Sequence, residues 1–176
     1  MCARLGIVLS QLYGGLAVIL PAVFHVILYE PEIPPNTGNV IRLCANVGAS
    51  LHLIHPLGFQ MDEASLRRAG LDYHELANVL EHQTLKACIA EVNPRRVYAL
   101  TTTGTRSLFE SNFISGDAFI FGSETRGLPR KVLGLFPEEA VLRIPMKPGN
   151  RSLNVSNCAA IVLYEAWRQG AFRGAR

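Results

Sequence analysis

The sequence predicts an α/β fold in which a parallel sheet is flanked by helices. Short apolar, β-branched segments alternate along the chain with segments whose apolar residues recur at helical spacing. With 176 residues, 49% of them hydrophobic and 18% charged, the chain suits one domain with a substantial core. Two polar, glycine-containing turns follow short apolar runs late in the chain, and open α/β sheets bind ligands beyond the carboxyl ends of their strands.

The first half of the domain is predicted as strand, helix, strand, helix. Residues 24–29 are apolar and β-branched and are followed by proline, which favours a strand that ends there. Residues 34–37 supply a turn and a helix cap, and the helical spacing that follows stops at Gly48. Residues 51–54 are the second predicted strand, and residues 63–69 are a short helix.

The second half continues the alternation. Residues 73–83 fit no single pattern, but residues 84–92 have helical spacing and residues 97–100 form a strand, before a polar loop at 101–107. The remaining predicted elements are a strand at 118–121, a helix at 129–135, a strand at 141–144 and a long final helix from about 154 to 169. Such alternation indicates a parallel sheet covered by helices on both faces.

The first 22 residues are expected to lie outside the domain, which spans 23–176. Residues 5–20 are apolar but interrupted by polar residues and glycines, superficially like a signal peptide, and short for a membrane span. A third interpretation is favoured, in which Val23 marks the true start and the upstream stretch is a mis-assigned start or a disordered extension. The protein is therefore expected in the cytoplasm, with no membrane association.

Metal binding is not expected. The four cysteines are far apart and form no C-x-x-C pair, so they are read as small buried hydrophobic residues. His52 and His55 would point to opposite faces of a strand and could not share an ion.

The familiar nucleotide-binding and hydrolase motifs are absent from the sequence. It contains no G-x-G-x-x-G, no P-loop and no G-x-S-x-G elbow. A net charge of +3 permits an anionic partner without requiring one. The ligand pocket is therefore assigned to the two polar turns, residues 122–128 and 148–154, which follow the apolar runs 119–121 and 142–145.

Three segments resemble the motifs of the SPOUT superfamily of RNA methyltransferases. They are Asn36-Thr37-Gly38-Asn39 with Arg42, residues 121–128, and residues 144–157. The similarity extends from about 24 to 172, and within the superfamily it is greatest to the small, single-domain tRNA enzymes that methylate the ribose 2'-hydroxyl of nucleotide 34.

The resemblance implies a fold that the general rule against threaded connections would exclude, a trefoil knot near the carboxyl end. It also implies a homodimer that holds S-adenosylmethionine in the knot, with the active site completed by the partner subunit. The implied substrate is the anticodon stem-loop of leucine tRNAs, at cytidine or modified uridine 34. Two alternatives stay open: another tRNA or rRNA position, or a non-catalytic RNA-binding module.

The resemblance also implies residue roles. The expected binders of the methyl donor are Leu100, Thr101, Gly122, Ile144, Met146 and Ser152. The expected catalytic residues are Asn36, Arg42, Glu124 and Asn154, and the expected contacts to RNA are Arg126, Arg151 and Tyr164. Because a guanidinium stays protonated, Arg42 is expected to grip a phosphate or polarise the ribose, with the proton passing to a phosphate oxygen or to water.

Several of these residues have a structural alternative. Gly122 lets backbone approach a ligand, or simply serves a turn. Glu124 either orients Asn36 and its own loop or pairs with Arg126 at the surface. Asn154 and Ser152 are both good caps for the last helix. Tyr164 either packs in a dimer interface or stacks near the substrate base.

Overall fold

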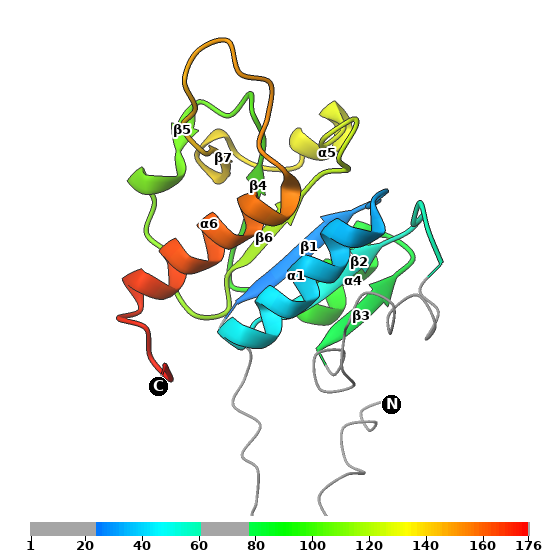
Figure 1. Ribbon diagram of the computed structural model, residues 1–176, viewed down its shortest axis with the longest axis horizontal. Helices are drawn as coiled ribbons and strands as arrows, with labels where there is room; N and C mark the ends of the chain where they lie inside the picture. The colour runs from blue at the N-terminus through cyan, green and yellow to red at the C-terminus, as the bar shows by residue number, and fades with distance from the viewer. Residues whose placement is uncertain (1–23, 61–77, 176) are drawn as a thin grey trace, which may run out of the picture.

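The computed structural model describes residues 24–60 and 78–175, and these form a seven-stranded sheet with helices on both faces (Figure 1). The order of strands across the sheet is β3-β2-β1-β6-β4-β7-β5. Every paired strand runs parallel to its neighbour, which confirms the predicted parallel sheet. The strands are β1 (His25–Tyr29), β2 (Ser50–Ile54), β3 (Val79–His82), β4 (Val97–Leu100), β5 (Arg106–Ser107), β6 (Ala118–Phe121) and β7 (Val141–Arg143).

The helices form two layers. The long helices α1 and α6 lie side by side on one face of the sheet, and α4 lies on the other (Figure 1). The helical segments are α1 (Pro34–Val47), α4 (Leu85–Val92), α5 (Arg130–Leu133) and α6 (Val155–Gln169), with 3-10 turns η1 (Leu108–Glu110) and η2 (Glu138–Ala140). None of the helices in the described part of the chain has the length and apolar character needed to span a membrane.

The two layers follow from the alternation of side chains along each strand. Val26 and Leu28 of β1 are buried in the core that contains α1 and α6. Ile27, between them, is buried in the second core, together with Cys88 of α4 and Val132 of α5. Because both faces of the sheet are covered, nearly every position in the central strands is apolar.

Most predicted elements are confirmed within two residues, but two strands were missed. β4 and β6 have the predicted bounds. β3 lies in the stretch that fitted no pattern, and the two-residue β5 lies in the loop predicted at 101–107. Two predictions, the helix at 63–69 and the extension at 1–22, lie outside the described residues.

Helix α1 begins differently from the prediction. Its N-cap residue is Ile33, whose side chain makes no capping hydrogen bond, and Pro34 is the first helical residue. Asn36 and Thr37, expected to form the cap, lie inside the first turn and are buried. Gly48 ends the helix as predicted, with a φ of 75° in the left-handed region. The side chain of Asn36 is thereby turned toward the sheet.

An ion pair with a buried carboxylate joins the start of β4 to the turn before β6. The Asp117 carboxylate is fully buried and accepts hydrogen bonds from Arg96 Nε at 3.0 Å, from Arg96 Nη2 at 2.6 Å and from the Ile114 amide at 2.9 Å. The hydrogen bond that Arg96 donates to Asp117 raises the pKa of Arg96. Removing Arg96 would therefore leave the buried Asp117 side chain with an unsatisfied oxygen.

The variant Arg96→Gln is expected to lower the free energy of unfolding by about 3 kcal/mol, because it leaves the buried Asp117 charge without its cation. This value is the lower end of the usual cost of breaking a buried ion pair, because the Arg96 side chain is itself 41% exposed. Urea unfolding measures the loss. The control is Arg95→Gln at the exposed neighbour, expected to stay within about 0.5 kcal/mol of the wild type. Equal losses in both variants would contradict the assigned role.

Candidate functional site

A cavity of about 610 Å³ opens at the carboxyl ends of the central strands. It lies among the loops that follow β4, β6 and β7, where parallel sheets place their ligands. The structure brings together most of the residues predicted for the site. Those that line the cavity are Asn36, Leu100, Thr101, Gly122, Glu124, Arg126, Ile144, Met146, Arg151, Ser152 and Asn154.

Glu124 connects the loop after β6 to the start of α1. Its carboxylate accepts hydrogen bonds from the Glu32 amide at 2.8 Å, from the Ile33 amide at 3.3 Å and from Asn36 Nδ2 at 3.0 Å. A negative group at this place also complements the positive end of the α1 dipole. Of the two interpretations weighed for Glu124, the structure has the one in which it orients Asn36.

Asn36 extends this network to the last helix. Its Oδ1 accepts a hydrogen bond of 2.8 Å from Asn154 Nδ2. Asn154 is the N-cap of α6, and its Oδ1 accepts from the Ser156 amide at 2.9 Å and from the Asn157 amide at 3.4 Å. The predicted capping role is confirmed for Asn154 and wrong for Ser152, which lies two residues before the cap and lines the cavity. Three segments distant in sequence thus meet through two side-chain amides and one carboxylate.

Arg126 pairs with two other glutamates at the rim. Its guanidinium lies 3.0 Å from Glu32 Oε1 and 3.5 Å from Glu30 Oε2. Thr125 Oγ1 donates to Glu32 Oε2 at 2.5 Å, and this bond together with Arg126 lowers the pKa of Glu32. The Arg126 side chain is 66% exposed, so a phosphate approaching the cavity can reach it.

Gly122 is required by the shape of its own loop. The loop closes on itself, with an isolated bridge between Ser123 and Gly127 and a 2.8 Å hydrogen bond from the Gly127 amide to the Ser123 carbonyl. A Cβ at position 122 would overlap the Gly127 carbonyl carbon and the Leu128 amide nitrogen. The close approach that requires glycine is therefore an approach of backbone to backbone.

A second glycine of this kind was missed in the sequence. A Cβ at Gly104 would lie 2.7 Å from the carbonyl carbon of Leu142, so the loop after β4 presses directly on β7. The Thr101 amide donates to the Leu142 carbonyl at 2.9 Å, and Thr102 and Thr103 line the cavity. The position of Gly104, Thr102 and Thr103 directly after a buried strand is the sequence signal that could have identified them.

Two predicted site residues lie outside the cavity lining. Arg42 is exposed on α1, and Tyr164 is 47% exposed on α6. Tyr164 makes an edge contact with Trp167, whose Nε1 donates to the Arg173 carbonyl at 3.0 Å. Arg42 therefore does not contribute to the cavity of its own chain in the described structure.

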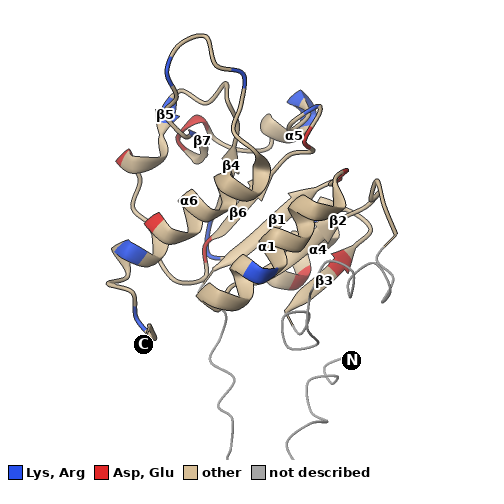
Figure 2. Ribbon diagram, in the orientation of Figure 1, with Lys and Arg blue, Asp and Glu red and all other residues tan. Residues whose placement is uncertain are grey.

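Positive charge gathers around the mouth of the cavity. Figure 2 shows Lys and Arg in β5, at α5 and in the loop between β7 and α6, all at the end of the sheet where the cavity opens. Arg130, Arg126 and Arg151 are themselves lining residues. These cations are grouped at one opening instead of being scattered over the surface. This grouping favours a polyanionic ligand.

One group of described residues could hold a metal ion, and the sequence did not reveal it. His52, His82 and Cys88 are buried next to one another, on different elements from the cavity. The expectation that no metal binds rested on the absence of a C-x-x-C pair and on His52 and His55 pointing apart, and it did not combine a cysteine with histidines distant in sequence. His55 instead lies 2.8 Å from Glu81.

Comparison with protein families finds one match over most of the chain. The profile of the SpoU rRNA Methylase family matches residues 23–164. A relative from Burkholderia ambifaria, named tRNA (cytidine(34)-2'-O)-methyltransferase, is 59% identical over 153 residues, which are 86% of this chain and 98% of the relative.

Solved structures show the same arrangement of elements. One described as "Structural insights into the 2-OH methylation of C/U34 on tRNA" is 45% identical with a TM-score of 0.77, and the match covers 85% of this chain and 97% of the other. The SpoU methyltransferase AviRb of Streptomyces viridochromogenes, solved with AdoMet, has a TM-score of 0.73 at 24% identity, over 89% of this chain and 61% of AviRb.

Proposed function

Since the chain belongs to the SpoU rRNA Methylase family, we propose that it methylates the ribose 2'-hydroxyl of nucleotide 34, cytidine or modified uridine, in leucine tRNAs. The methyl donor proposed is S-adenosylmethionine. The observation that carries the proposal is the cavity in which Asn36, Glu124 and Asn154 bond to one another at the strand ends. A polar network of this kind holds a site rigid before the substrate arrives.

The cavity suits the donor in size and in lining. A volume of about 610 Å³ lies in the range of small-molecule pockets, which combine apolar walls with a few placed polar groups. Leu100 and Ile144 offer apolar walls, while Thr101 and Ser152 offer hydroxyls and backbone groups. When bound, S-adenosylmethionine supplies a methyl carbon on a sulfonium sulfur, and the ribose oxygen displaces that sulfur in line.

Arg42 is proposed to act in the cavity of a partner subunit. Within one chain it lies on α1 outside the cavity lining, while α6 beside it exposes Tyr164. A homodimer that packs along α1 and α6 would cover that aromatic side chain and bring Arg42 to the second cavity. There Arg42 would grip a phosphate and orient the ribose, and positioning supplies much of the rate in such transfers.

The hydroxyl proton needs an acceptor other than Arg42, since a guanidinium is effectively always protonated. A phosphate oxygen of the RNA or a water molecule is proposed for this role. The C–O bond forms as the C–S bond breaks, and the proton leaves the oxygen to that acceptor. Asn36 and Asn154 would hold the ribose edge with their amides.

A trefoil knot is proposed at the carboxyl end. After β7 the chain reaches α6, whose Gln169 contacts the connection between β4 and β6: its Oε1 accepts from the Phe113 amide at 2.7 Å, and its Nε2 donates to the Ser111 carbonyl at 3.0 Å. These contacts hold the end of α6 against the connection that a knot would thread. Single-molecule stretching from the two termini tests this, because a knotted chain stays shorter than its full contour length. Full extension would contradict the knot.

The function is tested by incubating the protein with labelled S-adenosylmethionine and total tRNA, then mapping 2'-O-methylation by nucleotide. Label at position 34 of leucine tRNAs is the expected result. Label at another tRNA position, or in rRNA offered in parallel, would replace the proposed acceptor. Absence of label in all RNA pools, with binding retained, would favour a non-catalytic RNA-binding module.

The variant Glu124→Gln is expected to lower kcat by about tenfold to a hundredfold, because losing charge-assisted hydrogen bonds costs about 1.5–3 kcal/mol. Glutamine keeps one acceptor oxygen where three N–H groups converge on the carboxylate. Steady-state kinetics with a leucine tRNA measure the change. The control is Glu139→Gln on the exposed η2 turn, which removes the same charge away from the cavity. Equal activity of the two variants would contradict the orienting role.

A further inference from the structure

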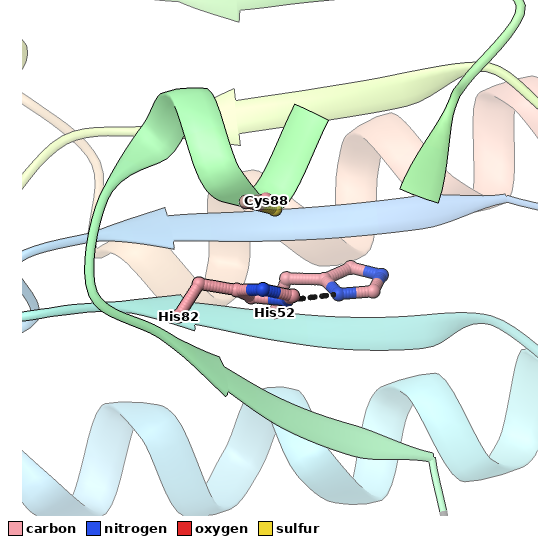
Figure 3. A group of neighbouring side chains, drawn as sticks. All are labelled: His52, His82 and Cys88. Atoms are coloured by element: carbon pink, nitrogen blue, oxygen red, sulfur yellow. Dashed lines mark hydrogen bonds between the residues drawn. The ribbon is translucent and has the colours of Figure 1, made fainter. Parts of the chain in front are cut away.

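Two histidines and a cysteine from three different elements meet between the sheet and α4 (Figure 3). His52 comes from the middle of β2, His82 from the end of β3 and Cys88 from α4. One ligand atom from each of the three lies within 4.8 Å of the others, and all three residues are buried. None of them lines the large cavity, so methyl transfer does not account for them.

The histidines are arranged in a ladder across the strands. A hydrogen bond of 3.0 Å joins His52 Nδ1 and His82 Nε2, so a metal ion bound by both nitrogens would take the place of the proton between them. The outer nitrogens have other partners: His52 Nε2 lies 3.1 Å from His25 Nδ1, and His82 Nδ1 lies 3.4 Å from Glu91 Oε2. His25 and Glu91 therefore hold the two rings in place from opposite sides.

We propose that His52 Nδ1, His82 Nε2 and Cys88 Sγ bind a divalent transition-metal ion of the zinc type. Imidazole nitrogen and thiolate sulfur are the ligands that zinc takes in proteins. Ligating histidines characteristically hydrogen-bond through their other ring nitrogen to an outer group; His52 does so with His25, and His82 has the Glu91 carboxylate 3.4 Å from its outer nitrogen. The buried Cys88 would then be a metal ligand as well as a packing residue.

The spacing of the donor atoms is close to what such an ion needs. Three donors 4.8 Å apart would each lie about 2.8 Å from a common centre, and zinc requires about 2.0–2.3 Å. The inner nitrogens are already closer than that limit, at 3.0 Å. A shift of roughly 0.5 Å in side chains brings all three within bonding distance.

The protonation state of His52 suits a metal ligand, whereas Cys88 must lose a proton when the ion binds. Burial, with smaller effects from His25 and His82, lowers the pKa of His52 to about 3, so its ring is neutral and keeps one nitrogen lone pair. Burial raises the pKa of Cys88 to about 12, so the free residue is a thiol. Coordination replaces that proton, which passes to solvent, because the charge of the ion favours the thiolate.

The position of the cluster indicates a structural role and a route of entry. Among the described strands, β3 is the last on its side of the sheet, and the Glu91 side chain next to His82 is 66% exposed. An ion bound here would tie α4 to both β2 and β3. It would therefore stabilise this edge of the sheet without touching the reacting groups.

Cobalt(II) is the probe for the test, since it reports thiolate ligation by absorption. The full-length chain, freed of metal with a chelator, is titrated with Co(II). One equivalent is expected to produce an intense near-ultraviolet band from sulfur-to-cobalt charge transfer, and Zn(II) is expected to remove it and raise the Tm. Absence of the band in folded wild-type protein would overturn the proposal.

Matched variants assign the ligands. Cys88→Ser is expected to abolish the sulfur band, while Cys2→Ser, Cys44→Ser and Cys158→Ser keep it; an unchanged band in Cys88→Ser would overturn the proposal. Because a buried substitution can unfold the chain, Glu91→Gln at the exposed end provides a second test, checked for native circular dichroism. It is expected to weaken Co(II) binding about 10-fold to 100-fold. Unchanged affinity would contradict a supporting role for the Glu91 carboxylate beside His82.

Discussion

Replacing Gly122 by alanine is expected to abolish methyl transfer and to lower the free energy of unfolding by about 3 kcal/mol, the upper end for overpacking. The added Cβ would overlap the backbone of Gly127 and Leu128, which no change of rotamer can relieve. The loop that carries Glu124 would have to open, and Glu124 would lose the hydrogen bonds that it accepts from Asn36 and from the Glu32 amide. Stability and activity therefore fall together.

Urea unfolding and calorimetric titration with S-adenosylmethionine measure the two losses separately. The matched control is Gly134→Ala, at the end of α5, where φ is −66° and the nearest atom to a new Cβ lies at an ordinary 3.5 Å. That variant is expected to stay within about 0.5 kcal/mol of the wild type and to bind the donor normally. Wild-type donor binding by Gly122→Ala would show that the loop tolerates the side chain and would contradict the prediction.

Mixed dimers are expected to show that Arg42 serves the partner's cavity. Arg42→Ala alone should lower kcat by about 100-fold, as removal of one preorganised charged donor does. A dimer of one Arg42→Ala chain with one Asn36→Ala chain should regain about half of wild-type activity, because one cavity then has both groups intact if each Arg42 crosses to its partner. If Arg42 served its own chain, both cavities would be defective.

Differently tagged chains, purified as the mixed species, allow this measurement, with each single-variant homodimer as control. Activity of the mixed dimer no higher than that of the homodimers would contradict the crossing. Arg42→Lys supplies an independent test through a profile of rate against pH. Lysine keeps the charge but lacks the planar fork of guanidinium, so activity close to the wild type would contradict a bidentate grip.

The regular elements were predictable because each is determined by its own stretch of residues. β4 and β6 are four-residue apolar segments between turn signals, and their predicted bounds are those observed. Gly48 ended α1 for a local reason, the left-handed conformation that follows a helix. β5 was missed because a two-residue strand has no periodicity, and only the neighbouring β7 makes it a strand.

The sequence predicted which residues form the site better than it predicted the contacts among them. Most of the expected residues line one cavity, because loops after parallel strands meet at one edge of the sheet. The sequence left undecided whether Glu124 pairs with Arg126 or with Asn36. In the structure Asn36 Nδ2 donates to Glu124 Oε1 at 3.0 Å, although the two residues are about ninety positions apart in the chain.

The sequence by itself determined the parallel α/β architecture, the positions of most elements and the group of residues around the cavity. These depend on local propensity, on side-chain periodicity and on motif residues that stand close together in the chain. Only the tertiary structure decided that Gly122 is required by its own loop, that Arg42 lies outside the cavity of its chain, and that His52, His82 and Cys88 meet. Each of these is set by the distance between segments brought together by strand order, a quantity that no stretch of sequence contains.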